Sequence, residues 1–281
     1  MKHRRNLRPL GALAAVLLLS FGPAQAASPA TGMPAGKVSA AVSDAETRKF
    51  LALADEYYDA IARYEPVNAT DNGDNRFDDQ IGMAIAPAER ARQFARYRDY
   101  TRRLGQIDRH KLTHRDRINH DVLAFELRTL LSYEPYPGHL LPLSQMDSMP
   151  VTLANFASGE ASQPLTSVAQ YGAYLNRLTQ LPAWIDQAIA NMREGMRSGV
   201  TQPKAIMVSA LPQFRKLVST VPEQSIYYTP VNRMPAGFSA ADKARLTAGY
   251  RAAVMQLQPA LARLAEFIER DYIPACRTST G

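Results

Sequence analysis

Apolar residues recur at intervals of three and four along most of the chain, which is the spacing that places them on one face of an α-helix. The clearest case is the C-terminal segment from Leu246 to Ile268. No segment shows sustained alternation of apolar and polar residues, so a sheet is not expected. The pattern predicts an all-α fold, an irregular bundle of about six long, partly kinked helices with two long loops.

Capping residues, prolines and glycines set the predicted helix boundaries. Thr113 with Asp116, and Ser239 with Asp242, have the spacing of a hydroxyl cap and an acidic third residue. The predicted helices cover residues 43–64, 87–104, 113–134, 166–199, 203–218 and 239–268. Proline inside a helix breaks its hydrogen bonding, so Pro182 and Pro212 predict kinks. On the third helix, the inward face is predicted to be Ile118, Val122 and Phe125.

Two long segments lack helical periodicity. Residues 134–165 carry five prolines, and residues 222–238 form the second connector. Loops of this length inside a compact domain are uncommon and are often functional. A shorter Asp-rich segment, residues 68–80, has turn chemistry, and its carboxylates are also candidates for calcium. It lacks the spacing of a calcium-binding EF-hand loop, which favours the turn.

The first 26 residues have the features of a signal peptide. A basic start is followed by an apolar run and by Ala24-Gln25-Ala26, the small-x-small pattern of a cleavage site. The Arg4-Arg5 pair leaves a twin-arginine export route open. The apolar run is too short to span a bilayer, so no stable membrane anchor is expected. We therefore predict an exported protein, periplasmic or secreted, with a flexible linker over residues 27–42 and a helical domain over residues 43–281.

Charge and cysteine content exclude several classes of function. Loss of the four basic residues of the signal peptide takes the formal net charge from +7 to +3. The remaining charge is not clustered, so nucleic acid is not an expected partner. Cys276 is the only cysteine, which rules out a disulfide within the chain and a zinc site built from several cysteines.

The residues of the chain do not form a recognisable catalytic motif. After loss of the signal peptide the histidines are His110, His114, His120 and His139. The zinc-protease pattern His-Glu-x-x-His is absent, and so is a nucleophilic Gly-x-Ser-x-Gly. We therefore assign no catalytic residue, no metal ligand and no cofactor within this chain.

Several stretches nevertheless resemble a bacterial family, domain-of-unknown-function family 885, in their order and spacing. The resemblance runs from about residue 45 to the last residue and covers only the N-terminal half of the family pattern. The stretches that carry it are Tyr57-Tyr58-Asp59 with the Asp-rich turn, and residues 116–121, 141–146, 171–178, 194–203 and 274–279.

The resemblance implies a helical protein whose complete members are zinc-metallopeptidase-like hydrolases, with zinc held in a C-terminal half that this chain lacks. The chain would then be the N-terminal part of such a hydrolase and not catalytic on its own. Its partners would be a peptide substrate or the missing C-terminal half. Gln145 and Arg277 are candidates to line the cleft. The alternative is a non-catalytic periplasmic protein that binds a peptide or a partner helix. The sequence does not fix the oligomeric state.

Overall fold

A computed structural model describes residues 37–159 and 161–279, with backbone only for residues 37–44. The chain divides into two compact units, Met1–Val38 and Ser39–Gly281, and nearly all of the described residues belong to the second. The α-helices are α1 (Lys37–Tyr64), α2 (Pro66–Asp71), α3 (Pro87–Leu104), α4 (His114–Ser132), α5 (Met149–Ser158), α6 (Val168–Ser198), α7 (Lys204–Leu217), α8 (Ala240–Phe267) and α9 (Ile273–Ala275). These described residues contain no β-strand, and the all-α prediction is confirmed.

Short helical turns connect these helices. They are the 3-10 turns η1 (Asn75–Phe77), η2 (Arg109–Lys111), η3 (Gly138–Leu140), η4 (Pro222–Gln224) and η5 (Ile226–Arg233), and the π-turn η6 (Ile268–Tyr272). The predicted signal peptide, residues 1–26, lies outside the described residues. The predicted linker over residues 27–42 overlaps the first turns of α1, because that helix begins at Lys37 instead of Ser43.

The predicted capping chemistry holds at two helix starts, those of α4 and α8. The Thr113 hydroxyl accepts a hydrogen bond from the amide of Asp116 at 3.2 Å, and the Ser239 hydroxyl accepts one from Asp242 at 3.0 Å. Helix α6 is capped one residue later than predicted, at Ser167, with Gln170 completing the capping box. The helix continues through Pro182.

The predicted loop over residues 134–165 is wrong in its centre, where α5 forms. Ser148 caps the helix, and Pro150 lies in its first turn, where a missing amide hydrogen costs nothing. Gly159 ends it at φ 75°, a left-handed conformation that favours glycine. The high proline content of this segment predicts a loop, although Pro150 is compatible with the first turn of a helix.

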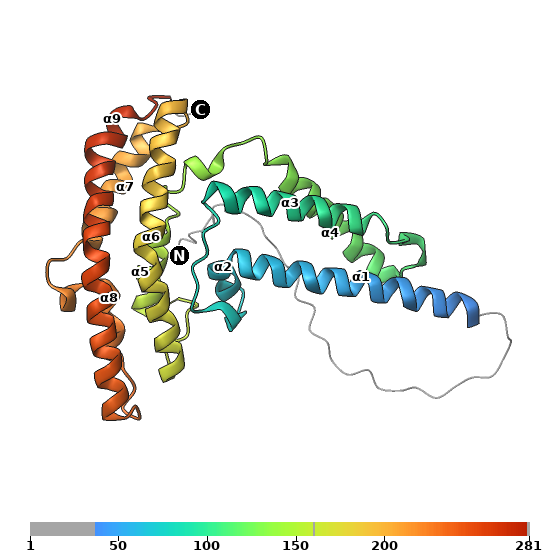
Figure 1. Ribbon diagram of the computed structural model, residues 1–281, viewed down its shortest axis with the longest axis horizontal. Coiled ribbons are helices and arrows are strands. Elements are labelled where there is room, and N and C mark those ends of the chain that lie inside the picture. Colours follow the sequence, from blue (N-terminus) through green and yellow to red (C-terminus); the bar gives the residue numbers. More distant parts are fainter. Residues whose placement is uncertain (1–36, 160, 280–281) are drawn as a thin grey trace, which may run out of the picture. The chain divides into compact units, whose positions relative to one another are not determined.

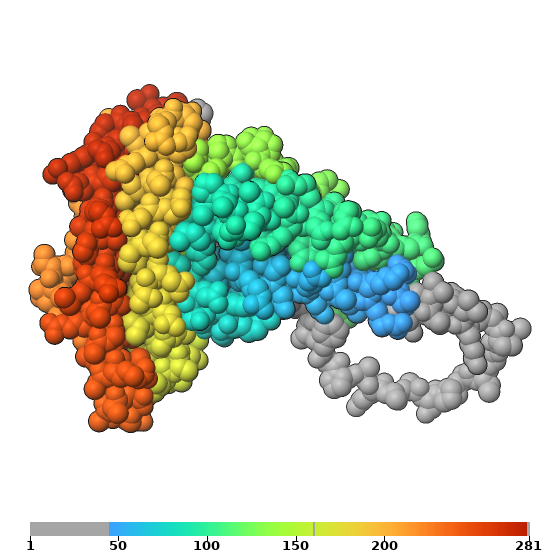
Figure 2. All heavy atoms as spheres, viewed as in Figure 1, coloured from blue at the N-terminus to red at the C-terminus, as the bar shows by residue number. Residues whose placement is uncertain are grey.

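The larger core surrounds the contact between α6 and α8. Figure 1 shows these helices side by side, and Figure 2 shows them in contact along their length. Helices α5 and α7 and the turn η5 complete this core. Leu178, Ile185, Leu257 and Leu264 are fully buried in it. The apolar face predicted for the segment from Leu246 to Ile268 is therefore confirmed.

Buried tyrosines bond through their hydroxyl groups to the backbone of α5 and of the first turn of α6. Tyr174 donates to the carbonyl of Leu153 at 2.8 Å, and Tyr227 donates to that of Pro150 at 2.8 Å. Tyr250 donates to the carbonyl of Tyr171 at 2.9 Å. A buried hydroxyl needs a partner, so each ring fixes one backbone segment.

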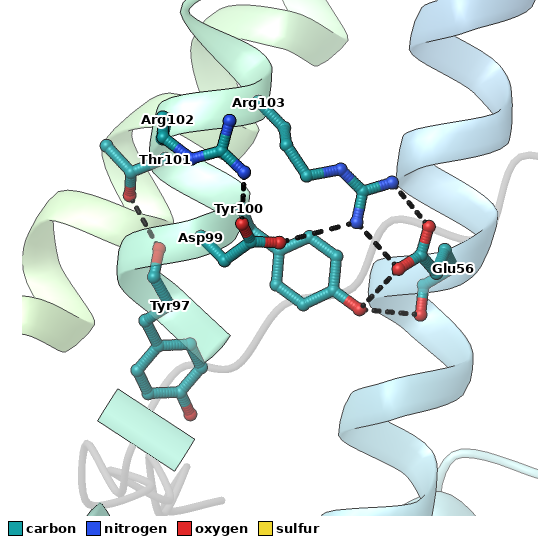
Figure 3. A network of polar contacts seen from close by, with 7 residues as sticks. All are labelled: Glu56, Tyr97, Asp99, Tyr100, Thr101, Arg102 and Arg103. Carbon is teal, nitrogen blue, oxygen red and sulfur yellow. Dashed lines mark hydrogen bonds and ion pairs between the residues drawn. The ribbon is translucent and has the colours of Figure 1, made fainter. Parts of the chain in front are cut away.

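A smaller core lies among α1, α3 and α4, with Phe50, Leu104 and Leu127 buried in it. Polar contacts flank it. In Figure 3, Glu56 of α1 points toward α3, where Arg103 donates to its two carboxylate oxygens at 2.7 and 2.5 Å. On the α4 side, the hydroxyl of Tyr57 donates to Glu126 at 2.8 Å.

Helix α4 presents a different face to this core from the predicted one. Leu123 and Leu127 are buried, whereas Ile118, Val122 and Phe125 are 52%, 49% and 61% exposed. Apolar residues lie on two faces of α4, and the positions of α1 and α3 decide which of the two faces is buried.

Arg177 of α6 joins the Asp-rich segment to the larger core. Its side chain is fully buried, and its guanidinium lies 5.3 Å from the centre of the Phe156 ring. It donates hydrogen bonds to the carbonyl oxygens of Pro66, Phe77 and Gln80 and to the side chains of Thr70 and Gln163. Asp78 accepts from Thr70 at 2.6 Å and from Asn75 at 3.0 Å. Residues 68–71 of the Asp-rich segment lie in helix α2, where a turn was predicted, and only residues 72–80 fold as the hydrogen-bonded turns that their chemistry predicts.

Candidate functional site

Three segments far apart in the sequence meet at one end of the larger core. They are residues 141–148, 199–204 and 272–279, and we call them the loop junction. The side-chain amide of Gln202 donates to the carbonyl of Leu143 at 3.0 Å, and its backbone amide donates to the hydroxyl of Tyr272 at 3.0 Å. The backbone amide of Lys204 donates to the carbonyl of Arg277 at 2.9 Å. Gln202 therefore contacts both other segments.

Two glycines make this arrangement sterically feasible. Gly199 ends α6 at φ 76°, and its amide donates to the carbonyl of Gly195. A Cβ atom on Gly195 would clash with the carbonyl oxygen of Val200 and would lie 3.3 Å from that of Leu140. Because both neighbours are backbone, neither can move cheaply. Both glycines belong to the 194–203 stretch that resembles the family.

Arg277 fixes the C-terminal segment to the turn after α6. Its amide donates to the Thr201 hydroxyl at 3.0 Å, and its Nε donates to the Thr201 carbonyl at 3.2 Å. Another guanidinium nitrogen donates to the Ser279 carbonyl at 3.2 Å. Pro203 and Arg277 form an isolated parallel bridge. The side chain is exposed, and among the described residues its guanidinium bonds to neutral acceptors only, so its charge is available for an anionic group.

Gln145 lies at the exposed tip of the 141–148 segment. The Ser144 hydroxyl accepts the amides of Met146 at 3.2 Å and Asp147 at 3.0 Å, which shapes a tight turn around it. Met146 beside it is 82% exposed. The segments that carry the two predicted site residues, Gln145 and Arg277, therefore both contact the turn after α6. No hydrogen bond joins their side chains to each other in the described contacts.

Tyr272 and Gln202 are the residues of this site that sequence reasoning missed. Tyr272 lies in the π-turn η6 directly after α8, a form of helix found often at functional sites. Its side chain is fully buried, and burial raises the pKa of its hydroxyl. Gln202 stands inside a family-like stretch, but only the fold shows that it bridges two loops.

The exposed groups of the loop junction suit recognition of polar groups. An amide and a guanidinium donate hydrogen bonds to carbonyl or carboxylate oxygens. Asp147 adds one exposed carboxylate. In the described residues, no group of three or more His, Cys, Asp or Glu side chains is placed to hold a metal ion.

The histidines have separate surroundings. The rings of Phe50 and His120 lie 6.0 Å apart, and Nδ1 of His120 is 3.4 Å from Asp121. The carbonyl of His139 accepts from Asn191 at 2.9 Å, and its Nδ1 is buried without a partner in the described residues. Burial lowers the pKa of His139, and the charge of Arg90 lowers it further.

A groove of about 510 Å³ lies elsewhere, between α6 and the end of α8 with η6. An ion pair between Arg263 and Asp186, at 2.8 Å, crosses the groove. A second pair, between Arg270 and Glu266 at 2.9 Å, borders it. Neither Gln145 nor Arg277 lines this groove. It is therefore separate from the loop junction.

The fold and the loop junction define a helical protein built around two long central helices with its candidate site at their ends. The chain belongs to the family described as bacterial protein of unknown function (DUF885), whose model matches residues 66–281. No curated protein matches. Since the family description states no activity, membership by itself assigns none.

A solved structure is similar in fold. It is titled "The crystal structure of the putative lipoprotein from Colwellia psychrerythraea", with 14% sequence identity and a TM-score of 0.65. The match covers 85% of this chain and 43% of that one, so the chain spans less than half the length of this structural relative. In the described part of our chain, no helix is both long and apolar enough to cross a membrane.

Proposed function

We propose that this chain forms the N-terminal, substrate-contacting part of an exported metallopeptidase-like hydrolase and is not catalytic on its own. The observation that carries the proposal is the loop junction, where Leu143, two residues before Gln145, and Arg277 both contact the turn after α6. The family match and the 43% coverage of a solved relative support a larger architecture. The sequence features of residues 1–26 support export.

The chemistry of the loop junction suits binding of a peptide. Hydrogen bonds to the turn after α6 hold both segments, so the backbone that carries the exposed amide and guanidinium is positioned before a substrate arrives, which lowers the entropic cost of binding. Gln145 would donate to a peptide carbonyl, and Arg277 would pair with a carboxylate. In this proposal, the two residues orient the substrate.

The side chains of the loop junction do not fit a zinc ion. Zinc takes thiolate, imidazole and carboxylate ligands, whereas the junction offers an amide, a guanidinium, the exposed carboxylate of Asp147 and the buried thiol of Cys276. Burial raises the pKa of that thiol to about 11, which disfavours the thiolate that zinc binds. We therefore derive no catalytic step through a metal in this chain. Zinc and the groups that activate water would come from the rest of the family architecture.

Two experiments test this proposal. A peptidase assay of the purified chain with added zinc should give no hydrolysis above background, and robust hydrolysis by the chain alone would contradict it. Sequencing of the gene past codon 281 should find a continuing or adjacent reading frame that encodes a His-Glu motif.

The second candidate function is a non-catalytic periplasmic protein that binds a peptide or a partner helix. The exposed apolar face of α4 favours it. A free-standing binding protein should be monodisperse and unfold cooperatively, whereas a fragment should associate through surfaces that its missing half would cover. Size-exclusion chromatography with light scattering distinguishes the two.

A further inference from the structure

Helix α4 carries an exposed ridge of large apolar side chains. Ile118, Val122 and Phe125 follow each other at intervals of four and three, so they lie on successive turns of one face. Their side chains are 52%, 49% and 61% exposed. On the opposite side, Leu123 and Leu127 are buried in the smaller core. The helix is therefore apolar on two faces, and only one of them is covered.

The ridge differs from the single exposed apolar residues on other helices. Leu51, Val208 and Met255 belong to three different helices and are single exposed side chains. Scattered residues of this kind are normal on protein surfaces, whereas an aligned group marks an interaction site. A row at this spacing fits between the side-chain rows of another helix.

Positive charge runs along one edge of the ridge. With 3.6 residues per turn, Arg117 and Arg128 fall on the same flank, about a quarter turn from the ridge. The guanidinium of Arg128 lies 5.6 Å from the centre of the Phe125 ring. In the described residues neither arginine has a carboxylate within ion-pair distance.

The acidic residues of the exposed part of α4 are already engaged. Asp121 accepts two hydrogen bonds from Arg109, at 2.7 and 2.5 Å. Glu126 accepts the hydroxyl of Tyr57 at 2.8 Å. The flank therefore keeps unneutralised positive charge, which an acidic partner would complement.

Charge also argues against a second copy of this chain as the occupant. In an antiparallel pair of α4 helices related by a two-fold axis, the same flank of each helix meets itself. Arg117 of one copy would then face Arg128 of the other, and like charges at such positions repel. The ridge is not self-complementary.

We propose that the Ile118–Val122–Phe125 ridge of α4 binds an amphipathic helix of another polypeptide, with acidic residues along the edge that faces Arg117 and Arg128. This surface is separate from the loop junction, and its binding does not depend on peptidase activity. Failure of one proposal therefore leaves the other standing.

A pair of designed peptides tests this inference on the full chain. Both are helical, about 21 residues long, with a leucine ridge, and carry either Glu or Lys along one flank. In fluorescence anisotropy, the Glu peptide should bind about tenfold more tightly than the Lys peptide. Arg117→Glu with Arg128→Glu should reverse that preference.

Two valine variants provide a matched comparison. Val122→Glu should weaken binding of the Glu peptide at least about tenfold, because it places a charge in the contact. Val208→Glu, at a site that is 51% exposed on α7, should leave binding unchanged. Because Val122 is half exposed, its variant should keep the circular dichroism spectrum and melting temperature of the wild type.

Four results would overturn the inference. They are no saturable binding of the Glu peptide, equal binding of the two peptides, an unchanged affinity in Val122→Glu, or a dimer in light scattering that Val122→Glu dissociates. The last would identify a second copy as the occupant.

Discussion

The backbone amide of Gln202 donates a hydrogen bond of 3.0 Å to the hydroxyl of Tyr272, 70 residues later in the chain. The bond links the turn after α6 to the π-turn after α8, the ends of the two central helices. Because Tyr272 is fully buried, water cannot replace this partner easily. This bond holds the C-terminal segment of the loop junction in place.

Replacement of Tyr272 by Phe should destabilise the protein. The change leaves the Gln202 amide without its partner in a partly buried site, at a cost of about 1 kcal/mol. Urea denaturation followed by circular dichroism measures the difference. Tyr133→Phe is the matched control, since that ring is 57% exposed. Equal stability of the two variants would show that the bond contributes nothing.

Alanine at Gly195 should be costly and alanine at Gly172 should not, although both glycines lie in α6. A Cβ atom on Gly195 meets backbone, whereas one on Gly172 has nothing within 4 Å. Gly172→Ala should stabilise by up to about 1 kcal/mol through helix propensity, and Gly195→Ala should lose at least about 1–3 kcal/mol through overpacking. Thermal melts compare them, and a stabilised Gly195→Ala would contradict the close approach of α6 to the loop junction.

Replacement of Arg177 by Met should unfold or strongly destabilise the Asp-rich segment. Three carbonyls and two side chains lose their buried donor, for an expected cost of about 3 kcal/mol or more. Arg197→Met, on the exposed end of the same helix, should cost less than about 1 kcal/mol, because its ion pair with Glu194 is at the surface. Amide hydrogen exchange at residues 66–80 should increase only in the Arg177 variant.

His139 should make stability fall on mild acidification. Its pKa in the folded state lies below 6.5, so the unfolded chain binds more protons as the pH falls. The stability due to the neutral ring is present above pH 6.5 and is lost as the pH falls through the lower folded pKa. The urea midpoint of the wild type should therefore decrease between about pH 7 and pH 5.

The matched variants for this effect are His139→Gln and His114→Gln. The first should flatten the pH dependence, because glutamine does not titrate. The second, at an exposed position, should leave it as in the wild type. An unchanged slope in His139→Gln would assign the acid sensitivity to other groups.

Local capping signals predicted helix starts well, because they depend on neighbours in sequence. Thr113 and Ser239 form the predicted hydrogen bonds. Helix α5 escaped prediction because its proline was interpreted as part of a loop, although proline suits a first turn. The family resemblance singled out Gln145 and Arg277. The structure adds that the turn after α6 contacts the segments of both residues.

By itself the sequence determined the helical fold class, most helix boundaries and the family, since periodicity, caps and motifs are properties of short stretches. Tertiary structure decided which face of α4 is covered and which loops meet at Gln202. Burial depends on what packs against a helix, and a helix with two apolar faces leaves that choice to its neighbours. For the same reason, the local sequence pattern does not predict a contact between residues 70 positions apart, such as that of Gln202 with Tyr272.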